Sequence, residues 1–138
     1  MKIIYILLIS MLYITPSKAD NLSCLAEAVY FEARSETFVA QLAVANVILQ
    51  RVQSEHYPDN KCHFSYWCDG KPETIANVDA YNEAVSAAEL ALQGVVLIHT
   101  EGATHYHASY VTPYWALDER FSLVGQIDKH VFYIDNSR

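Results

Sequence analysis

Two glutamates, Glu32 and Glu36, stand four residues apart at the end of an apolar helical run, with Arg34 between them. Apolar neighbours disfavour the charged form of a carboxylate, so Glu32 is expected to keep a proton available for general acid catalysis. The two acids share one helix face if the helix continues through Glu36. If the helix breaks at Ser35, Glu36 can turn back toward Glu32 or cap the next helix. Arg34 is expected to be a structural ion-pair partner, and the whole cluster is also typical of a solvated helix end.

A second group of polar side chains is the run His105-Tyr106-His107, which is predicted to lie on a strand. Alternation along a strand places the two histidines on one face and Tyr106 on the other. Three interpretations stay open: hydrogen bonding to the hydroxyls or amides of a substrate, a metal pair with Glu32 as third ligand, and polar strand residues satisfied by the backbone. His130, which precedes an apolar run, is interpreted as a histidine at the core edge rather than a ligand.

Residues 54–78 lack a periodic apolar pattern and contain Pro58 and Gly70, which predicts a long loop. Loops of this length in a compact domain are usually functional or disordered. The aromatic residues of the loop, among them Phe64 and Trp67, are expected to form either a hydrophobic cluster beneath it or a wall that faces the substrate.

The three cysteines, Cys24, Cys62 and Cys68, leave at least one thiol without a partner inside the chain. In an exported protein a disulfide between Cys62 and Cys68 could close the aromatic loop. A bond from Cys24 to either of them is the alternative. The spacing does not match that of a zinc site.

The N-terminus begins with Met1-Lys2 and continues as an apolar stretch over residues 3–14, followed by Pro16 and Ala19. This pattern is typical of a secretory signal peptide over residues 1–19, and the stretch is shorter than the roughly 20 residues of a membrane-spanning helix. An uncleaved anchor is the alternative. Residues 20–138 are expected to form one domain, exported to the periplasm or the extracellular space.

The acidic balance of the chain limits its partners. With 9 basic and 16 acidic residues, the formal net charge is −7, and the basic residues are not clustered. Phosphate recognition needs clustered cations, so a nucleic-acid partner is not expected. A neutral or mixed-charge polymer such as a glycan is compatible with this surface.

Apolar periodicity predicts three helices and a small β portion. The helices are expected from Asn21 or Ser23 to Arg34, from Phe38 to Gln53, and from Asn77 or Asp79 to Gln93, with Gly94 ending the last. The second is apolar around most of its circumference, which predicts a buried central helix. Strands are expected over 104–108 and 127–134, a short helical turn over 113–116, and a strand or the turn into one over 95–98.

Six short motifs follow one another along residues 20–138 and cover most of them. They are Leu25-Ala26 with Tyr30-x-Glu32-Ala33-Arg34-x-Glu36, Gln41-x-Ala43-Val44-Ala45-x-Val47-Ile48-Leu49-x-Arg51-Val52, Phe64-Ser65-x-x-Cys68-Asp69-Gly70, Gly102-Ala103-Thr104-His105-Tyr106-His107, Val111-x-Pro113-x-Trp115-Ala116, and Ile127-x-x-His130-x-Phe132-Tyr133. In this order they resemble the spore-cortex-lytic (SleB/CwlJ-type) family of cell-wall hydrolases. Ser35, Thr37 and Gln50 depart from the residues that are usual in that family.

The resemblance implies an α+β domain, related to lysozymes and lytic transglycosylases and mainly helical with a short antiparallel β portion in its C-terminal half. It implies an enzyme that acts on peptidoglycan, with Glu32 as the catalytic acid and Glu36 as a candidate second acid. The residues assigned to substrate binding are Tyr106, His105, His107, Phe64 and Trp67. No cofactor or bound metal is expected, no membrane span is expected after signal cleavage, and the enzyme is expected to act as a monomer.

The expected reaction cuts the glycan strand between N-acetylmuramic acid and N-acetylglucosamine, with Glu32 protonating the bridging oxygen. A hydrolase needs a second carboxylate, about 5–5.5 Å away for retention or about 6.5–9.5 Å for inversion. A lytic transglycosylase needs one acid, and this outcome is favoured because Glu36 is the only obvious second acid nearby. The alternatives are a metal-dependent amidase that uses His105 and His107, and a peptidoglycan-binding module without catalysis.

Overall fold

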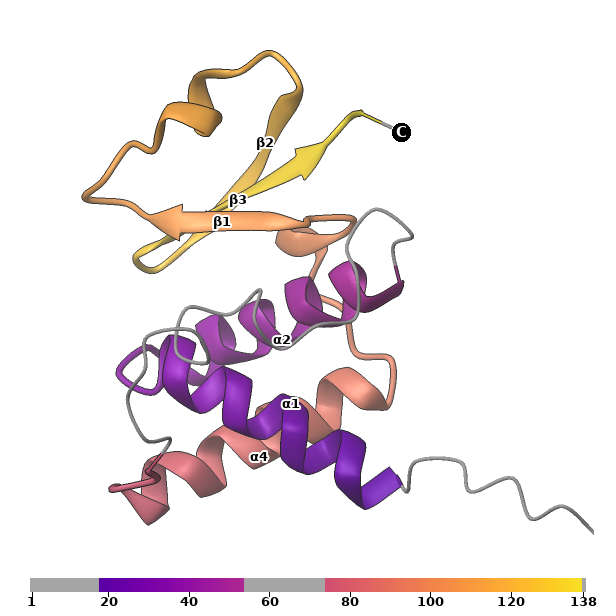
Figure 1. Ribbon diagram of the computed structural model, residues 1–138, viewed down its shortest axis with the longest axis vertical. Coiled ribbons are helices and arrows are strands. Elements are labelled where there is room, and N and C mark those ends of the chain that lie inside the picture. The colour runs from indigo at the N-terminus through magenta and orange to yellow at the C-terminus, as the bar shows by residue number, and fades with distance from the viewer. Residues whose placement is uncertain (1–17, 54–73, 138) are drawn as a thin grey trace, which may run out of the picture.

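The computed structural model describes residues 18–53 and 74–137 of the 138-residue chain. Within these two ranges, three α-helices are followed by a three-stranded antiparallel sheet, and Figure 1 shows α2 lying between that sheet and the pair α1 and α4. The α+β class predicted from the sequence is confirmed. The elements are α1 (Lys18–Ala33), α2 (Phe38–Gln53), α4 (Val78–Leu92), the 3₁₀ helices η2 (Ile98–Thr100) and η3 (Tyr114–Leu117), and the strands β1 (His105–Ala108), β2 (Phe121–Ile127) and β3 (His130–Asp135).

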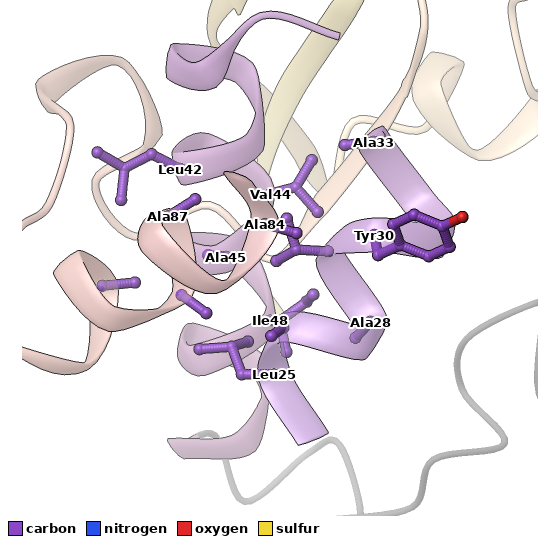
Figure 2. Close-up of a cluster of buried hydrophobic side chains, with 14 residues drawn as sticks. Leu25, Ala28, Tyr30, Ala33, Leu42, Val44, Ala45, Ile48, Ala84 and Ala87 are labelled. Carbon is purple, nitrogen blue, oxygen red and sulfur yellow. The ribbon is translucent and has the colours of Figure 1, made fainter. Parts of the chain in front are cut away.

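The helical core is built largely from small side chains. α2 is buried without interruption from Ala40 to Ile48, which confirms it as the central helix. Alanines on α2 and α4 let the helix axes approach closely, while larger residues such as Leu25 and Tyr30 fill the space beside them (Figure 2). Removing this apolar surface from water is the main force that holds the three helices together.

The N-terminal helix differs from its prediction at both ends. It begins at Lys18, ahead of the expected caps Asn21 and Ser23, because Lys18 and Ala19 are both good helix formers. It ends at Ala33, one residue before the expected end. Across residues 18–53 and 74–137, no helix has the length and apolarity that crossing a membrane requires.

The turn between α1 and α2 is held by the side chain of Thr37. Its hydroxyl accepts a hydrogen bond from the backbone N–H of Ala40 at 3.3 Å, which caps α2. The same hydroxyl donates to the carboxylate of Asp128 in the turn between β2 and β3. Asp128 has a φ of 48°, a left-handed conformation that Asp tolerates better than most residues. Thr37 therefore ties the helical half of the molecule to the sheet.

The end of α4 follows its prediction, and of the two alternatives for the segment after it, a strand or a turn, the strand does not form. Gly94 has a φ of 92°, and the N–H of Val95 donates to the carbonyl of Leu90, which closes the helix as a Schellman motif. The apolar run over 95–98 forms no strand. The buried Asn46 of α2 donates to the carbonyl of Val95 and accepts from the N–H of Leu97, so its amide takes backbone groups that a strand would pair.

The C-terminal sequence forms two strands where one was predicted. The strand expected over 127–134 is confirmed from His130 onward as β3, but its start is wrong, because Asp128 and Lys129 make a turn and Ile127 ends β2. β3 lies in the centre of the sheet order β1-β3-β2, and both pairings are antiparallel. The alternation of β2 is interrupted by a bulge between Leu123 and Gly125, which removes the period that sequence reasoning depends on.

Candidate active site

The candidate site joins the last turn of α1 to the first strand of the sheet. The phenol of Tyr106 on β1 donates a hydrogen bond of 2.8 Å to Oε2 of Glu32, across 74 residues of sequence. Glu32 is partly exposed, and Tyr106 faces the helices. Burial, followed by the charge of Glu32 and the hydrogen bond to it, raises the pKa of Tyr106 well above its usual 10. The phenol is therefore a hydrogen-bond donor at every working pH.

Beyond Tyr106, the site continues onto β3. The ring of His130 lies edge-on to that of Tyr106, with 5.2 Å between centroids, and Phe132 lies 6.0 Å from the same ring. His130 is buried. Burial lowers its pKa, although the charges of Glu36 and Glu32 each act to raise it. Sequence reasoning placed His130 at the core edge and gave it no part in the site; its position in the last of the six motifs was the available signal.

Glu36 does not share a helix face with Glu32, because α1 has already ended at Ala33. Its N–H donates to the carbonyl of Ala33, and its carbonyl accepts from Nε2 of the buried Gln41. Thr37, rather than Glu36, caps α2. Glu36 still affects the site by its charge, which acts to raise the pKa of His130 more strongly than the charge of Glu32 does.

Arg34 braces the same turn. Its guanidinium lies over the ring of Tyr30, 5.1 Å from the centroid, which is a cation–π contact. The phenol of Tyr30 accepts a hydrogen bond from the N–H of Asn77 at 3.1 Å. Arg34 thus has a structural role, as expected, through a ring contact where an ion pair was predicted.

His105 and His107 lie on the opposite face of β1 from Tyr106, as strand alternation predicts. They contact a ring cluster on the outer face of the sheet whose other members are Trp115, Phe121 and Tyr133. Nδ1 of His107 hydrogen-bonds to the carbonyl of Ala108 at 2.8 Å, which makes Nδ1 the protonated nitrogen. Nε2 of His107 can then accept from the phenol of Tyr133 at 3.0 Å.

The other outer-face histidine, His105, is also held by neighbours. Its Nδ1 lies 2.9 Å from the hydroxyl of Thr104. Burial, with a smaller contribution from the charge of Arg51, lowers the pKa of His105 to about 4, against an opposing effect of Asp135. His105 is therefore a neutral ring at neutral pH, packed in the ring cluster.

The structure brings together Glu32 and Tyr106, and it adds His130. It separates His105 and His107 from them by the thickness of the sheet, so a metal held by both histidines and Glu32 does not fit this geometry. Within the part of the chain that the structure describes, no three His, Cys, Asp or Glu side chains are grouped closely enough to hold a metal ion. Phe64 and Trp67 lie outside the described residues, as do Cys62 and Cys68, whereas Cys24 is a free thiol.

Comparison with known proteins gives a consistent result. The family model described as Cell Wall Hydrolase matches residues 35–133, a span that contains Tyr106 and His130 and begins three residues after Glu32. A spore cortex-lytic enzyme of Halalkalibacterium halodurans is 51% identical over 41 residues, which is 30% of this chain and 12% of that enzyme. The catalytic domain of the Bacillus cereus SleB protein is similar in structure, with a TM-score of 0.65 and 28% identity over 82% of this chain and 88% of that domain.

Proposed function

The chain belongs to the cell wall hydrolase family, in its SleB/CwlJ-type branch, and from this premise we propose that it cuts the glycan strand of peptidoglycan between N-acetylmuramic acid and N-acetylglucosamine. The similarity to a domain named as catalytic supports an enzyme rather than a binding module. The matched segment is only 12% of the curated spore cortex-lytic enzyme, so the support for this activity comes from the site of this chain.

The hydrogen bond from Tyr106 to Glu32 is the observation that carries the proposal. A general acid must give up a proton at the moment the glycosidic bond breaks, and it becomes a carboxylate as it does so. A phenol that always donates stabilises this carboxylate as it forms, by a hydrogen bond. Glu32 is thus arranged to lose a proton and to take one back.

The reaction then runs in two steps on one side chain. Glu32 gives its proton to the bridging oxygen, the bond from that oxygen to C1 of the muramyl residue breaks, and positive charge develops at C1. The Glu32 carboxylate next takes the proton of the muramyl 6-hydroxyl, whose oxygen bonds to C1. The products are a free N-acetylglucosamine hydroxyl and a 1,6-anhydro-muramyl end, with no water consumed and Glu32 protonated again.

Glu36 is the candidate second acid, which a hydrolase would use to activate water or to bond C1. The lytic transglycosylase is favoured because Tyr106 donates a hydrogen bond to Glu32, and because Glu36 lies beyond the end of α1 and does not share a helix face with Glu32. Tyr106 supports the developing positive charge beside Glu32. In this assignment Glu36 acts only through its charge.

The remaining predicted binding residues are proposed to bind parts of the peptidoglycan strand away from the bond that breaks. His105 and His107 contribute through the outer face of the sheet, while Phe64 and Trp67 contribute through the aromatic loop. A His107→Phe variant, which keeps a ring in the cluster, should bind purified sacculi more weakly. Equal retention of that variant and the wild type in a sedimentation assay would remove His107 from the binding role.

The proposed place of action is the cell wall, reached by export with the first 19 residues as signal peptide. The support is the sequence pattern of that segment and the family's named target. Fractionation of producing cells, combined with the N-terminal sequence of the exported chain, tests this directly: Asp20 is the expected first residue.

Mass spectrometry of sacculi digested by the purified protein tests the reaction type. Anhydro-muramyl ends are the expected product. Reducing muramyl ends would show a hydrolase, and free stem peptides would show an amidase. Bound protein with no soluble fragments would show a binding module, and any of these three results contradicts the transglycosylase.

A further inference from the structure

His130 is a buried histidine that the proposed reaction leaves unused. It opens β3, is 7% exposed, and pairs with Ala108 on β1 and with Ile127 on β2. Its ring lies edge-on to Tyr106 at 5.2 Å. Its Nδ1 has no hydrogen-bond partner among the described residues. A buried polar atom without a partner costs free energy, and a phenylalanine would fill nearly the same space without that cost. Packing alone therefore does not account for an imidazole at this position.

Four ionisable groups act on this ring by their charge or contact it, each from a different part of the fold. They are Glu32 on α1, Glu36 in the turn after α1, Asp128 in the turn before β3, and Tyr106 on β1. The three acids each favour the charged imidazole, yet burial outweighs them and the pKa of His130 lies below its usual 6.5. The ring is therefore neutral at neutral pH and takes up a proton only as the solution becomes acidic.

We propose that His130 is the positioning residue of the Glu32–Tyr106 pair, holding the phenol against the carboxylate while its ring is neutral and switching the pair off when its ring is protonated. The inference rests on the proposed function, because it concerns the same acid. A cation beside Glu32 stabilises the carboxylate and so withdraws the proton that the bridging oxygen needs. His130 thereby sets the acidic limit of the reaction.

The pH profile of sacculus lysis separates this role from packing alone. His130→Phe keeps an aromatic ring beside Tyr106 but cannot be charged. The ratio of its rate at about pH 5 to its rate at about pH 7.5 should exceed the wild-type ratio severalfold, because a ring that cannot be charged removes the loss of rate that protonation of His130 causes at acidic pH. His99→Phe, the same change at an exposed histidine on η2, should leave the ratio as it is. An unchanged ratio in His130→Phe overturns the proposal.

Histidine titration by NMR tests the same contact without any catalysis. The imidazole signals of His130 are assigned by their loss in His130→Phe and followed with pH. Glu32→Gln should lower the pKa of His130, because the Glu32 charge acts to raise it. Glu89→Gln, at an exposed acid on α4, should not change it. If the pKa of His130 is lowered in Glu32→Gln but the wild type does not lyse sacculi, the contact is supported and the proposed function is refuted. If the wild type lyses sacculi but the pKa of His130 is unchanged in Glu32→Gln, the inference alone is overturned.

Discussion

Both faces of β1 are lined by histidine and tyrosine side chains, but the polar atoms of these side chains have different partners on the two faces. On the outer face, His107 has hydrogen-bond partners at both ring nitrogens, and its neighbours are rings. On the inner face, Tyr106 points at a carboxylate, and His130 beside it has a buried nitrogen with no partner in the described part of the chain. The ring nitrogens of His107 are hydrogen-bonded within the sheet and are not placed for proton transfer, whereas Glu32 and Tyr106 on the inner face are placed to move a proton.

This contrast shows that residue type is a weaker guide to chemistry than the partners of each polar atom. A histidine pair attracts attention in the sequence, yet the structure occupies the hydrogen-bonding groups of that pair with Thr104, Ala108 and Tyr133. The single tyrosine between them makes the contact with Glu32. Substitutions that change one face at a time test this distinction.

The largest effect is expected at the acid itself. Glu32→Gln removes the transferable proton but keeps an oxygen that can accept from Tyr106, so lysis should fall by about 10²–10⁴-fold while the fold is retained. Turbidity loss of purified sacculi measures the rate, and circular dichroism during heating measures the fold. Lysis near the wild-type rate would show that the reaction does not depend on the inner face.

The next largest effect on the lytic rate is expected from one of two matched tyrosine substitutions. Tyr106→Phe and Tyr133→Phe each remove one hydroxyl that donates to a titratable group, on opposite faces of the sheet. Each should lower the free energy of unfolding by about 1 kcal/mol, the usual worth of one hydrogen bond. Only Tyr106→Phe should also slow the reaction, by about ten- to a hundredfold, since a charge-assisted bond is worth about 1.5–3 kcal/mol.

Equal rates for these two variants would contradict the distinction between the faces. Urea unfolding supplies the stability of each, so that a loss of folded protein is not mistaken for a loss of chemistry.

On the outer face, His105 is expected to make the free energy of unfolding depend on pH in the acidic range. The pKa of His105 is about 4 when folded, below its usual 6.5, so between these values the unfolded chain binds a proton that the folded chain does not. The free energy of unfolding therefore falls as the pH drops from 6.5 toward 4 and loses no more from this group below that. Melting at about pH 7 and about pH 4.5 should show a smaller drop for His105→Phe than for the wild type.

The size of that drop is modest, because His105 is partly exposed and solvent screens its interactions. An identical drop in the variant and the wild type would mean that the acid sensitivity of the fold arises elsewhere.

The smallest effect is expected where the two halves of the molecule are tied. Thr37→Ala removes the cap of α2 and the hydrogen bond to Asp128, and it should cost about 1 kcal/mol of stability. Because that contact fixes the turn before His130, the variant should also lose some lytic rate. Thermal melting and sacculus lysis, measured on the same preparation, check both. A stability equal to that of the wild type would show that Thr37 is dispensable.

Local pattern was enough to predict much of this architecture. The bounds of α2 follow from its apolar run, Asn77 and Gly94 mark α4, and alternation placed Tyr106 opposite its neighbouring histidines. β2 was missed because its bulge breaks the alternation. The strand considered for 95–98 does not form, because a distant amide, that of Asn46, hydrogen-bonds to the backbone there.

The site was harder to predict than the fold, because its contacts cross the chain. Glu32 stood out by its motif, but its contact with Tyr106 spans 74 residues. The place of His130 depends on how the hairpin docks on the turn at Thr37, and no periodic pattern carries that information. The local sequence around His130, a histidine before an apolar run, is the same for a residue at the core edge and for one beside a catalytic acid.

The most direct test of the account is digestion of sacculi in H₂¹⁸O by the wild type, Glu32→Gln and Glu36→Gln, followed by mass spectrometry of the released fragments. If Glu32 alone gives and retakes the proton, the wild type and Glu36→Gln release anhydro-muramyl ends without ¹⁸O, and Glu32→Gln releases almost nothing. Muramyl ends that carry ¹⁸O in the wild type and disappear in Glu36→Gln would contradict it, because Glu36 would then be directing water to C1.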